Sequence, residues 1–223
     1  MRIIVLGDIH FPYHNDKALK EALYITKQVK PTHIVQIGDL YDQYCFSRFT
    51  KKNIALPEDE LRSSFQLASR TWLRVRQLGT EGVKAYQILG NHDIRLIKRA
   101  EERLPEAQEL IKKSLMELYR FKGVKTIEDD RKELCIGNIT FMHGYRSRLG
   151  DHMRFNRTRT VVGHSHTGGV VYEQYSNDIL WELNAGYLAD ETAEPLRYRP
   201  QTTSKWTLGV GLVDERGPRF IPI

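Results

Sequence analysis

Short apolar runs alternate with longer amphipathic stretches along the first ninety residues. The runs at residues 3–6, 33–37 and 83–89 are mostly apolar, which is typical of buried strands. The stretches at 16–30 and 61–78 carry apolar residues every three or four positions, which predicts amphipathic helices. This order of elements favours an α/β fold whose first strands pair in parallel.

The pattern changes after residue 94. Residues 94–119 are highly charged with a helical period, and Pro105 divides them. The remainder predicts short, mainly antiparallel strands at residues 133–142, 160–162, 169–175, 179–183, 206–213 and 219–223. We therefore expect a single domain over residues 1–223, with a charged helical segment at about 94–120.

Composition excludes several classes of protein. With 40% apolar and 28% charged residues, the chain is not expected to be disordered. No apolar run approaches the roughly 20 residues that span a bilayer, and the first residues do not resemble a signal peptide. Cys45 and Cys135 are too few for a disulfide framework or a thiolate zinc site. We expect a cytoplasmic protein in a reducing compartment, without membrane contact.

Chemically active side chains gather where the expected strands end. Two carboxylates, one amide and five imidazoles follow these strands: Asp8, His10, Asp39, Asn91, His92, His143, His164 and His166. Because ligand sites in α/β sheets lie at the carboxyl ends of strands, these side chains can converge. Oxygen and imidazole donors without a thiolate suit Mn, Fe, Zn or Co. The number of donors is enough for two metals if one carboxylate bridges them.

Five short blocks carry a resemblance to a known family. They read Gly-Asp-Ile-His, Gly-Asp-Leu-Tyr-Asp, Gly-Asn-His-Asp, His-Gly and Gly-His-Ser-His, and they begin at residues 7, 38, 90, 143 and 163. In content and order they resemble the signature blocks of the calcineurin-like metallophosphoesterases, of the small bacterial or phage type. The resemblance implies an α/β fold in which a sandwich of two mixed β-sheets is flanked by helices.

The resemblance also implies a metal-dependent phosphoric ester hydrolase with two divalent ions. Manganese is the first choice, with iron, zinc, nickel or cobalt as alternatives. The implied ligands are Asp8, His10 and His166 for the first ion, Asn91, His143 and His164 for the second, and Asp39 as the bridge. A hydroxide held between the two ions would attack phosphorus in line.

Neighbours of these ligands have roles that the sequence leaves open. His92 would face the substrate, stabilise charge on the transferred phosphoryl group and protonate the leaving oxygen. Asp93 would orient His92, cap the helix that follows, or do both. Asp42 is either a hydrogen-bonding group behind the ligands or a turn residue. His14 either lines the pocket or packs within its loop.

The net charge of +6 is concentrated in one segment. Residues 146–159 contain five arginines and one aspartate, so they carry +4 and join two of the motif blocks. These arginines form either a clamp for substrate phosphates or a solvated basic surface. The clamp candidates are Arg146, Arg148, Arg154 and Arg157, with Arg159 beyond them. A second basic group comprises Arg95, Lys98, Arg99 and Arg103; nearby glutamates favour a solvated helix there.

These features support a phosphoesterase that hydrolyses phosphate mono- or diesters, with a nucleotide or nucleic acid as substrate and with the oligomeric state open. A nuclease or end-processing phosphatase, a Ser/Thr protein phosphatase-like enzyme and a non-catalytic metal-binding scaffold are the alternatives. The second and third blocks lack the arginines typical of protein Ser/Thr phosphatases, which weighs against that alternative. The intact His92 weighs against a scaffold.

Overall fold

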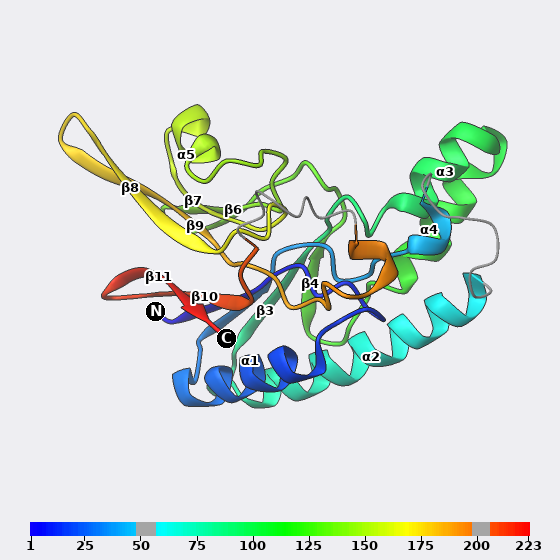
Figure 1. The fold of residues 1–223 in the computed structure, drawn as a ribbon, viewed down its shortest axis with the longest axis horizontal. Coiled ribbons are helices and arrows are strands. Elements are labelled where there is room, and N and C mark those ends of the chain that lie inside the picture. The colour runs from blue at the N-terminus through cyan, green and yellow to red at the C-terminus, as the bar shows by residue number, and fades with distance from the viewer. Residues whose placement is uncertain (48–56, 198–205) are drawn as a thin grey trace.

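Eleven strands in the described part of the chain form two sheets. The computed structural model describes residues 1–47, 57–197 and 206–223. The strands are β1 (Ile3–Leu6), β2 (His33–Gln36), β3 (Lys84–Ile88), β4 (Val124–Ile127), β5 (Leu134–Ile136), β6 (Ile139–Phe141), β7 (Arg159–Val162), β8 (Gly169–Tyr175), β9 (Asp178–Asn184), β10 (Gly209–Asp214) and β11 (Gly217–Pro222). The six-stranded sheet has the order β11-β10-β1-β2-β3-β4, and the five-stranded sheet has the order β5-β6-β7-β9-β8 (Figure 1).

Both sheets are mixed, as the family resemblance implied. Strands β1 to β4 are parallel, and β10 joins them antiparallel beside β1. In the second sheet β6, β7 and β9 are parallel, whereas β5 and β8 add antiparallel edges. The expectation of mainly antiparallel pairing after residue 133 is therefore wrong at the centre of this sheet. Parallel neighbours need long crossover connections, and α5 (Asp151–Asn156) lies in the connection from β6 to β7.

The buried strands explain how the layers are held together. Ile3 and Val5 of β1 point into an apolar core between the two sheets, whereas Ile4 and Leu6 point into a core beneath the helices. All four side chains are at most 2% exposed. Because β1 is covered on both faces, its sequence is an unbroken apolar run rather than an alternating one.

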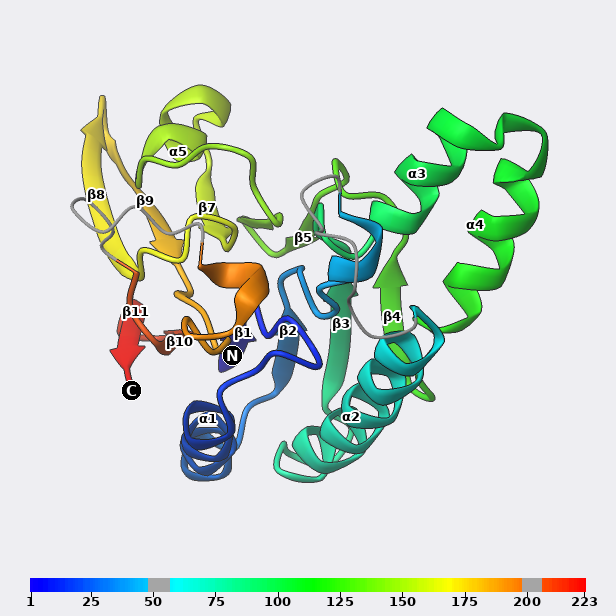
Figure 2. The same cartoon turned by 45° about the vertical axis from the view of Figure 1, so that its right-hand side comes forward.

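The helices cover the outer face of the six-stranded sheet. They are α1 (Asp16–Val29), α2 (Pro57–Gln77), α3 (Arg95–Arg103) and α4 (Gln108–Glu117), with 3-10 turns at Tyr44–Phe46, Pro105–Ala107 and Glu194–Leu196. Figure 2 shows α1 and α2 side by side on one side of this sheet. Asn15 caps α1 by accepting hydrogen bonds from the backbone N–H groups of Lys17 and Ala18. Pro105 separates α3 from α4, as the sequence indicated.

Three elements differ from the sequence expectation. The apolar run at 133–142 is a hairpin of β5 and β6, because Gly137 turns the chain with a φ of 62°. Strand β4 and helix α5 have short, partly polar sequences that gave no clear period. Within the described ranges, none of the helices is long and apolar enough to cross a membrane.

Candidate metal centre

The loops that follow β1 and β2 run side by side and bring the first donors together. The backbone N–H of Asp8 donates to the carbonyl of Gly38 over 3.2 Å, and that of His10 donates to the carbonyl of Asp39 over 2.9 Å. These bonds continue the pairing of β1 with β2 beyond the strands themselves. The carboxylates of Asp8 and Asp39 therefore leave the same edge of the sheet.

Five of the expected ligands have a left-handed backbone. The φ angles are 50° at Asp8, 55° at His10, 52° at Asp39, 66° at His164 and 58° at His166. This conformation is uncommon for residues other than glycine, and strained backbone is concentrated at functional sites. The five residues also come from both sheets. The strain thus marks one place in the molecule, where the ends of β1, β2 and β7 meet.

Two motif glycines allow this close approach. A Cβ atom at Gly163 would lie 2.6 Å from Oδ2 of Asp8, and one at Gly90 would collide with the side chain and backbone nitrogen of Asp39. Any larger residue at either position would displace a carboxylate. These two blocks therefore require glycine because no side chain fits there beside the carboxylates.

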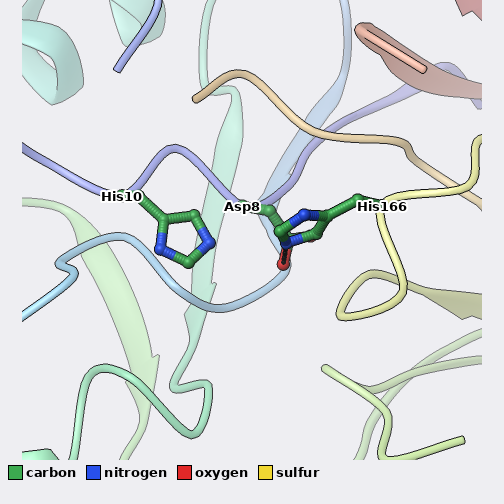
Figure 3. A group of neighbouring side chains, drawn as sticks. All are labelled: Asp8, His10 and His166. Atoms are coloured by element: carbon green, nitrogen blue, oxygen red, sulfur yellow. Dashed lines mark hydrogen bonds and ion pairs between the residues drawn. The ribbon is translucent and has the colours of Figure 1, made fainter. Parts of the chain in front are cut away.

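Three overlapping groups of donors form the cluster. They are Asp8 with His10 and His166, His10 with Asp39 and His92, and Asp39 with His143 and His164. In each group the donor atoms lie within 4.8 Å of one another. Figure 3 shows Asp8 between the rings of His10 and His166, and Nε2 of His166 lies 3.1 Å from Oδ1 of Asp8. Asn91 completes the cluster, because its Oδ1 lies 3.1 Å from Nε2 of His143 and 3.0 Å from Nδ1 of His164.

The donor set fits a divalent cation. Nδ1 of His143 lies 3.0 Å from the carbonyl of Ile37, so this nitrogen donates its proton there and Nε2 presents a lone pair. That lone pair faces Oδ2 of Asp39 over 3.2 Å and Oδ1 of Asn91 over 3.1 Å. In the same way His10 donates through Nδ1 to Asp42, and its buried Nε2 has no hydrogen-bond partner among the described residues. Inward-facing lone pairs of this kind are a stable arrangement around a positive charge.

When no cation is bound, Nε2 of His143 carries a proton at pH 7 and donates it to Oδ2 of Asp39. Burial opposes protonation of His143, but the carboxylates of Asp39 and Asp8 outweigh it and raise the pKa of His143 to about 10. Burial and the charge of His143 lower the pKa of His164 to about 4, so that its imidazole is neutral at pH 7. The cluster therefore favours positive charge at its centre while leaving a neutral nitrogen donor at its rim.

His92 is held by Asp42 and Arg95. Oδ2 of Asp42 accepts hydrogen bonds from Nδ1 of His10 over 2.7 Å and from Nδ1 of His92 over 3.1 Å. Burial opposes charge on Asp42, but His92 and His10 hold the pKa of this carboxyl well below its usual range. Arg95 donates to Oδ1 of Asp42 over 2.8 Å, and its other terminal nitrogen lies 3.1 Å from Nε2 of His92. Of the two interpretations of Asp42, the hydrogen-bonding group behind the ligands agrees with these contacts.

Asp93 does not contact His92 as expected. Its carboxylate accepts hydrogen bonds from the backbone N–H groups of Gly90 and Tyr41, both over 2.8 Å. It does not cap α3 either, because the residue before that helix is Ile94 and no side chain caps it. Asp93 instead ties the third motif loop to the second. The carboxylate that accepts the hydrogen bond from His92 is that of Asp42, which approaches His92 from the neighbouring loop.

The arginines of residues 146–159 do not form the expected clamp. Arg154 pairs with Glu173 and Asp151, and Arg159 pairs with Asp178. The guanidinium of Arg146 lies between the rings of Tyr145 and Phe155 instead of facing the donor cluster. Neither of the two cavities that border the cluster is lined by these arginines, by Arg148 or by Arg157. Two of the five arginines, Arg154 and Arg159, thus pair with acids on β8 and β9.

The second basic group lies at the cluster instead. A cavity of about 230 Å³ is lined by Asn91, Arg95, Lys98 and Arg99 together with Phe46. A second cavity of about 490 Å³ is lined by Asn91, His143 and His164 and also by Lys98 and Arg131. We expected this group to lie on a solvated helix. Its members at the start of α3 instead line cavities beside the donor cluster.

His14 packs within its loop. Its Nδ1 lies 3.2 Å from the carbonyl of Pro12, its Nε2 lies 3.2 Å from Asp16, and its ring contacts Phe11. Neither cavity beside the cluster is lined by His14. The contacts of His14 agree with the loop-packing interpretation.

Two residues that shape the site were hard to identify from the sequence. Arg95 is the first residue of α3 and follows His92 by three positions, but the glutamates nearby concealed this signal. His152 is 1% exposed, and its Nε2 accepts the backbone N–H groups of Tyr145 and Arg146 over 3.1 and 3.2 Å. It thereby fixes the loop that follows His143. No motif marks His152, because its partners are backbone groups.

Comparison with known proteins extends these observations. The chain is 25% identical over 246 residues to the Gene 54 protein of Mycobacterium phage L5, covering 100% of this chain and 93% of that protein. Among solved structures, YfcE, a phosphoesterase from E. coli, has a TM-score of 0.45 at 14% identity, covering 96% of this chain and 89% of that one. Vps29 of Chaetomium thermophilum has a TM-score of 0.49 at 12% identity, covering 100% and 97%.

The sequence model described as calcineurin-like phosphoesterase matches residues 1–207. This range includes all five motif blocks and the whole donor cluster. The chain therefore belongs to the calcineurin-like phosphoesterase family.

Proposed function

We propose that this protein is a hydrolase that uses two divalent metal ions to cleave phosphate mono- or diesters of nucleotides or nucleic acid. The observation that carries the proposal is the shared position of Asp39, whose Oδ2 lies 3.2 Å from Nε2 of His143 and 3.9 Å from Nε2 of His10. One carboxylate thus faces donors from both sheets, which supports its role as the bridging ligand.

The remaining ligand roles follow from the same cluster. Asp8, His10 and His166 would hold one ion, and Asn91, His143 and His164 would hold the other. Two bound divalent ions would polarise the phosphoryl group and supply a nucleophilic oxygen from water at neutral pH. Manganese is our first choice, because the donors are carboxylate, amide and imidazole without a thiolate.

In this proposal His92 acts on the substrate. Its Nδ1 donates to Asp42, which fixes the ring. Its Nε2 faces a terminal nitrogen of Arg95, beside the donor cluster. From this position His92 and Arg95 would stabilise negative charge on the transferred phosphoryl group. To give a proton to the leaving oxygen, His92 would have to carry that proton on Nε2, in place of accepting the hydrogen bond from Arg95 there. Asp42 would keep the ring in the orientation that this transfer needs.

A nuclease is the second candidate, because cations line both cavities beside the cluster. Lys98 lines both, Arg99 lines one and Arg131 the other, so a chain of phosphates could continue on either side of the cleaved bond. Cleavage of a polymer should then fall steeply with added salt, because phosphate contacts release counterions. Salt-insensitive turnover of small diesters, with no cleavage of oligonucleotides, would exclude this candidate.

The decisive experiment is a substrate panel. Metal-free protein is reloaded with Mn, Ni, Zn or Mg and given a chromogenic monoester, a chromogenic diester, cyclic nucleotides and labelled DNA. We expect hydrolysis that depends on the added metal. Two equivalents of bound metal by elemental analysis, together with no turnover of any substrate, would instead favour the metal-binding scaffold.

A His92→Ala variant tests the catalytic assignment. It should bind metal normally and lose turnover by a factor of about 10²–10⁴, as expected for a general acid. His33→Ala is the matched control, because His33 begins β2 and its ring stacks on Tyr86, away from the donors. Full activity in His92→Ala would overturn the assignment.

A further inference from the structure

The 490 Å³ cavity is lined by three kinds of side chain. Its lining includes Asn91, His143 and His164 of the donor cluster, the apolar side chains of Met142 and Tyr145, and the charged side chains of Lys98, Arg131 and Asp130. Its volume lies within the roughly 300–1,000 Å³ typical of small-molecule sites. Apolar side chains beside a phosphate-binding cluster and two cations suit a ligand that has both a flat ring and a phosphate.

Tyr145 is the most prominent apolar residue of the cavity. It is 59% exposed, although it is a large aromatic residue only two positions after His143. Its backbone N–H donates to His152, and the edge of its ring contacts the His152 ring at 5.1 Å between centroids. The ring is thus held in a fixed place while much of its surface remains in water. An exposed aromatic ring beside a donor cluster is available to stack on a ligand ring.

Arg146 and Phe155 extend this surface. The guanidinium carbon of Arg146 lies 5.1 Å from the centre of the Tyr145 ring and 4.7 Å from that of Phe155. Phe155 is 68% exposed. Nε of Arg146 is buried and donates to no acceptor among the described residues. The three side chains form an aromatic–cation–aromatic stack whose charge is not matched by an acid in the part of the chain that is described.

Two cations also line this cavity. Lys98 pairs with Asp130 over 3.3 Å, whereas no ion pair is found for Arg131 within the described ranges. Both Lys98 and Arg131 line the cavity beside Tyr145. A ring placed on Tyr145 would therefore have cations available for the phosphates attached to it.

We propose that this cavity is a nucleotide subsite, in which Tyr145 stacks on a base next to the cleaved phosphate while Lys98 and Arg131 contact the adjoining phosphate. The inference rests on the proposed function and narrows its substrate to esters that carry a nucleobase. Stacking on an aromatic side chain accepts any base, because every base has a π-face. The base must be unpaired, so the source is a free nucleotide or a single strand, not an intact duplex.

The test compares substrates with and without a base. The metal-loaded protein is given a single-stranded oligothymidylate, a strand of the same length with abasic residues, thymidine monophosphate esters and the corresponding sugar phosphate esters. Phosphorothioate versions of both strands, which resist hydrolysis, report binding by fluorescence anisotropy. Tyr145→Ala should weaken binding and kcat/KM about tenfold for base-bearing ligands and leave the abasic ligands unchanged.

Two variants control this experiment. Tyr145→Phe keeps the ring and should retain the preference for a base. Tyr24→Ala removes a tyrosine of similar exposure, 57%, from α1 and should change nothing. Preference for the oligonucleotide over the mononucleotide would identify a strand as the source, and the reverse would identify a free nucleotide; both outcomes support the subsite.

The inference and the proposed function can fail separately. If the wild type hydrolyses base-bearing and abasic esters equally and Tyr145→Ala has no selective effect, the subsite is overturned and the phosphoesterase stands. An equal loss on both ligand types in Tyr145→Ala also overturns it, because the ring would then be structural. If nothing is hydrolysed but strand binding still depends on the base and on Tyr145, the subsite stands and the hydrolase proposal fails.

Discussion

Asp39 uses its two carboxylate oxygens for different purposes. Oδ1 accepts the backbone N–H of His92 over 2.8 Å, which fixes the third motif loop against the second. Oδ2 faces His143 and His10, which belong to different donor groups. Burial opposes its charge, but His143 and His92 hold the pKa of Asp39 well below its usual range. An ionised carboxylate is therefore available at neutral pH.

Replacing Asp39 by Asn should lower the occupancy of both metal positions. The amide keeps the shape of the side chain but removes the negative charge that both ions would share. Elemental analysis after equilibration with one metal should give well below one equivalent in total, because both positions lose metal. Asp178→Asn, on the β8–β9 hairpin, is the control. Loss of only one equivalent would refute the bridging role.

Replacing Asp42 by Asn should lower kcat while keeping most of the metal. His92 and His10 both donate to Oδ2 of Asp42, so the change weakens the orientation of a catalytic ring and of a ligand. Residues that orient ligands in this way typically contribute about 10–100-fold. Steady-state kinetics corrected for bound metal measures the effect. Unchanged kcat would show that Arg95 suffices to hold His92.

Single residues were predicted from the sequence where a motif names them. The seven expected ligands lie together because each follows a strand that the apolar pattern identified. Asp42 and Arg95 were not identified with the same clarity. Their importance depends on which loop faces which, and sequence spacing alone does not contain that information.

At the scale of elements, a buried carboxylate attaches the start of α2 to the second motif loop. Oε2 of Glu60 accepts hydrogen bonds from the hydroxyl of Tyr13 over 3.1 Å and from the backbone N–H of Cys45 over 3.2 Å. Glu60 is 4% exposed, and burial raises the pKa of its carboxyl above the ordinary value. The contact joins α2 to the loops after β1 and β2.

Glu60→Gln should change how stability depends on pH. Because the folded pKa is raised, the folded protein binds more protons than the unfolded chain between the ordinary value of about 4.3 and the folded value. The wild type therefore loses stability, relative to Glu60→Gln, as pH rises through this window. Urea unfolding at pH 4 and pH 7 measures the difference. The exposed Glu58→Gln is the control, and parallel profiles for wild type and Glu60→Gln would contradict the prediction.

The sequence predicted strands well where both faces of the strand are buried. It predicted poorly which acids the charged side chains would pair with. All four residues of β1 and the last three of β2 are buried, so their short apolar runs indicate strands clearly. The arginines of residues 146–159 looked like one basic feature. In the fold, Arg154 and Arg159 meet Glu173 and Asp178, whose approach depends on the β8–β9 hairpin returning beside β7.

At the scale of the whole molecule, the donor cluster joins the two sheets. Asp8 and Asp39 follow strands of the six-stranded sheet, whereas His143 and His164 follow β6 and β7 of the other. A metal held by these residues would be lost on unfolding, because the sheets separate. Metal binding should therefore stabilise the entire fold and not one loop.

Metal loading should raise Tm. A free metal concentration one hundred times Kd stabilises the folded state by about 2.7 kcal/mol per site. For a chain of this size, that corresponds to an increase of roughly 5–10 °C. Calorimetry with and without EDTA checks this, and Asp39→Asn should show a smaller increase. An unchanged Tm at saturating metal would contradict a cluster shared between the sheets.

The position of β1 between β2 and β10 has a consequence for biosynthesis. While a ribosome makes the chain, β2 follows β1 within about thirty residues, but the antiparallel partner β10 emerges nearly two hundred residues later. Until then one edge of β1, a wholly apolar strand, has unpaired backbone N–H and C=O groups. These groups can pair with a strand of a neighbouring chain, which favours aggregation. A circular permutant that starts at residue 206 supplies β10 first, and the two ends lie near each other in Figures 1 and 2. It should yield more soluble product in chaperone-free translation than the natural order, and an equal yield would contradict this.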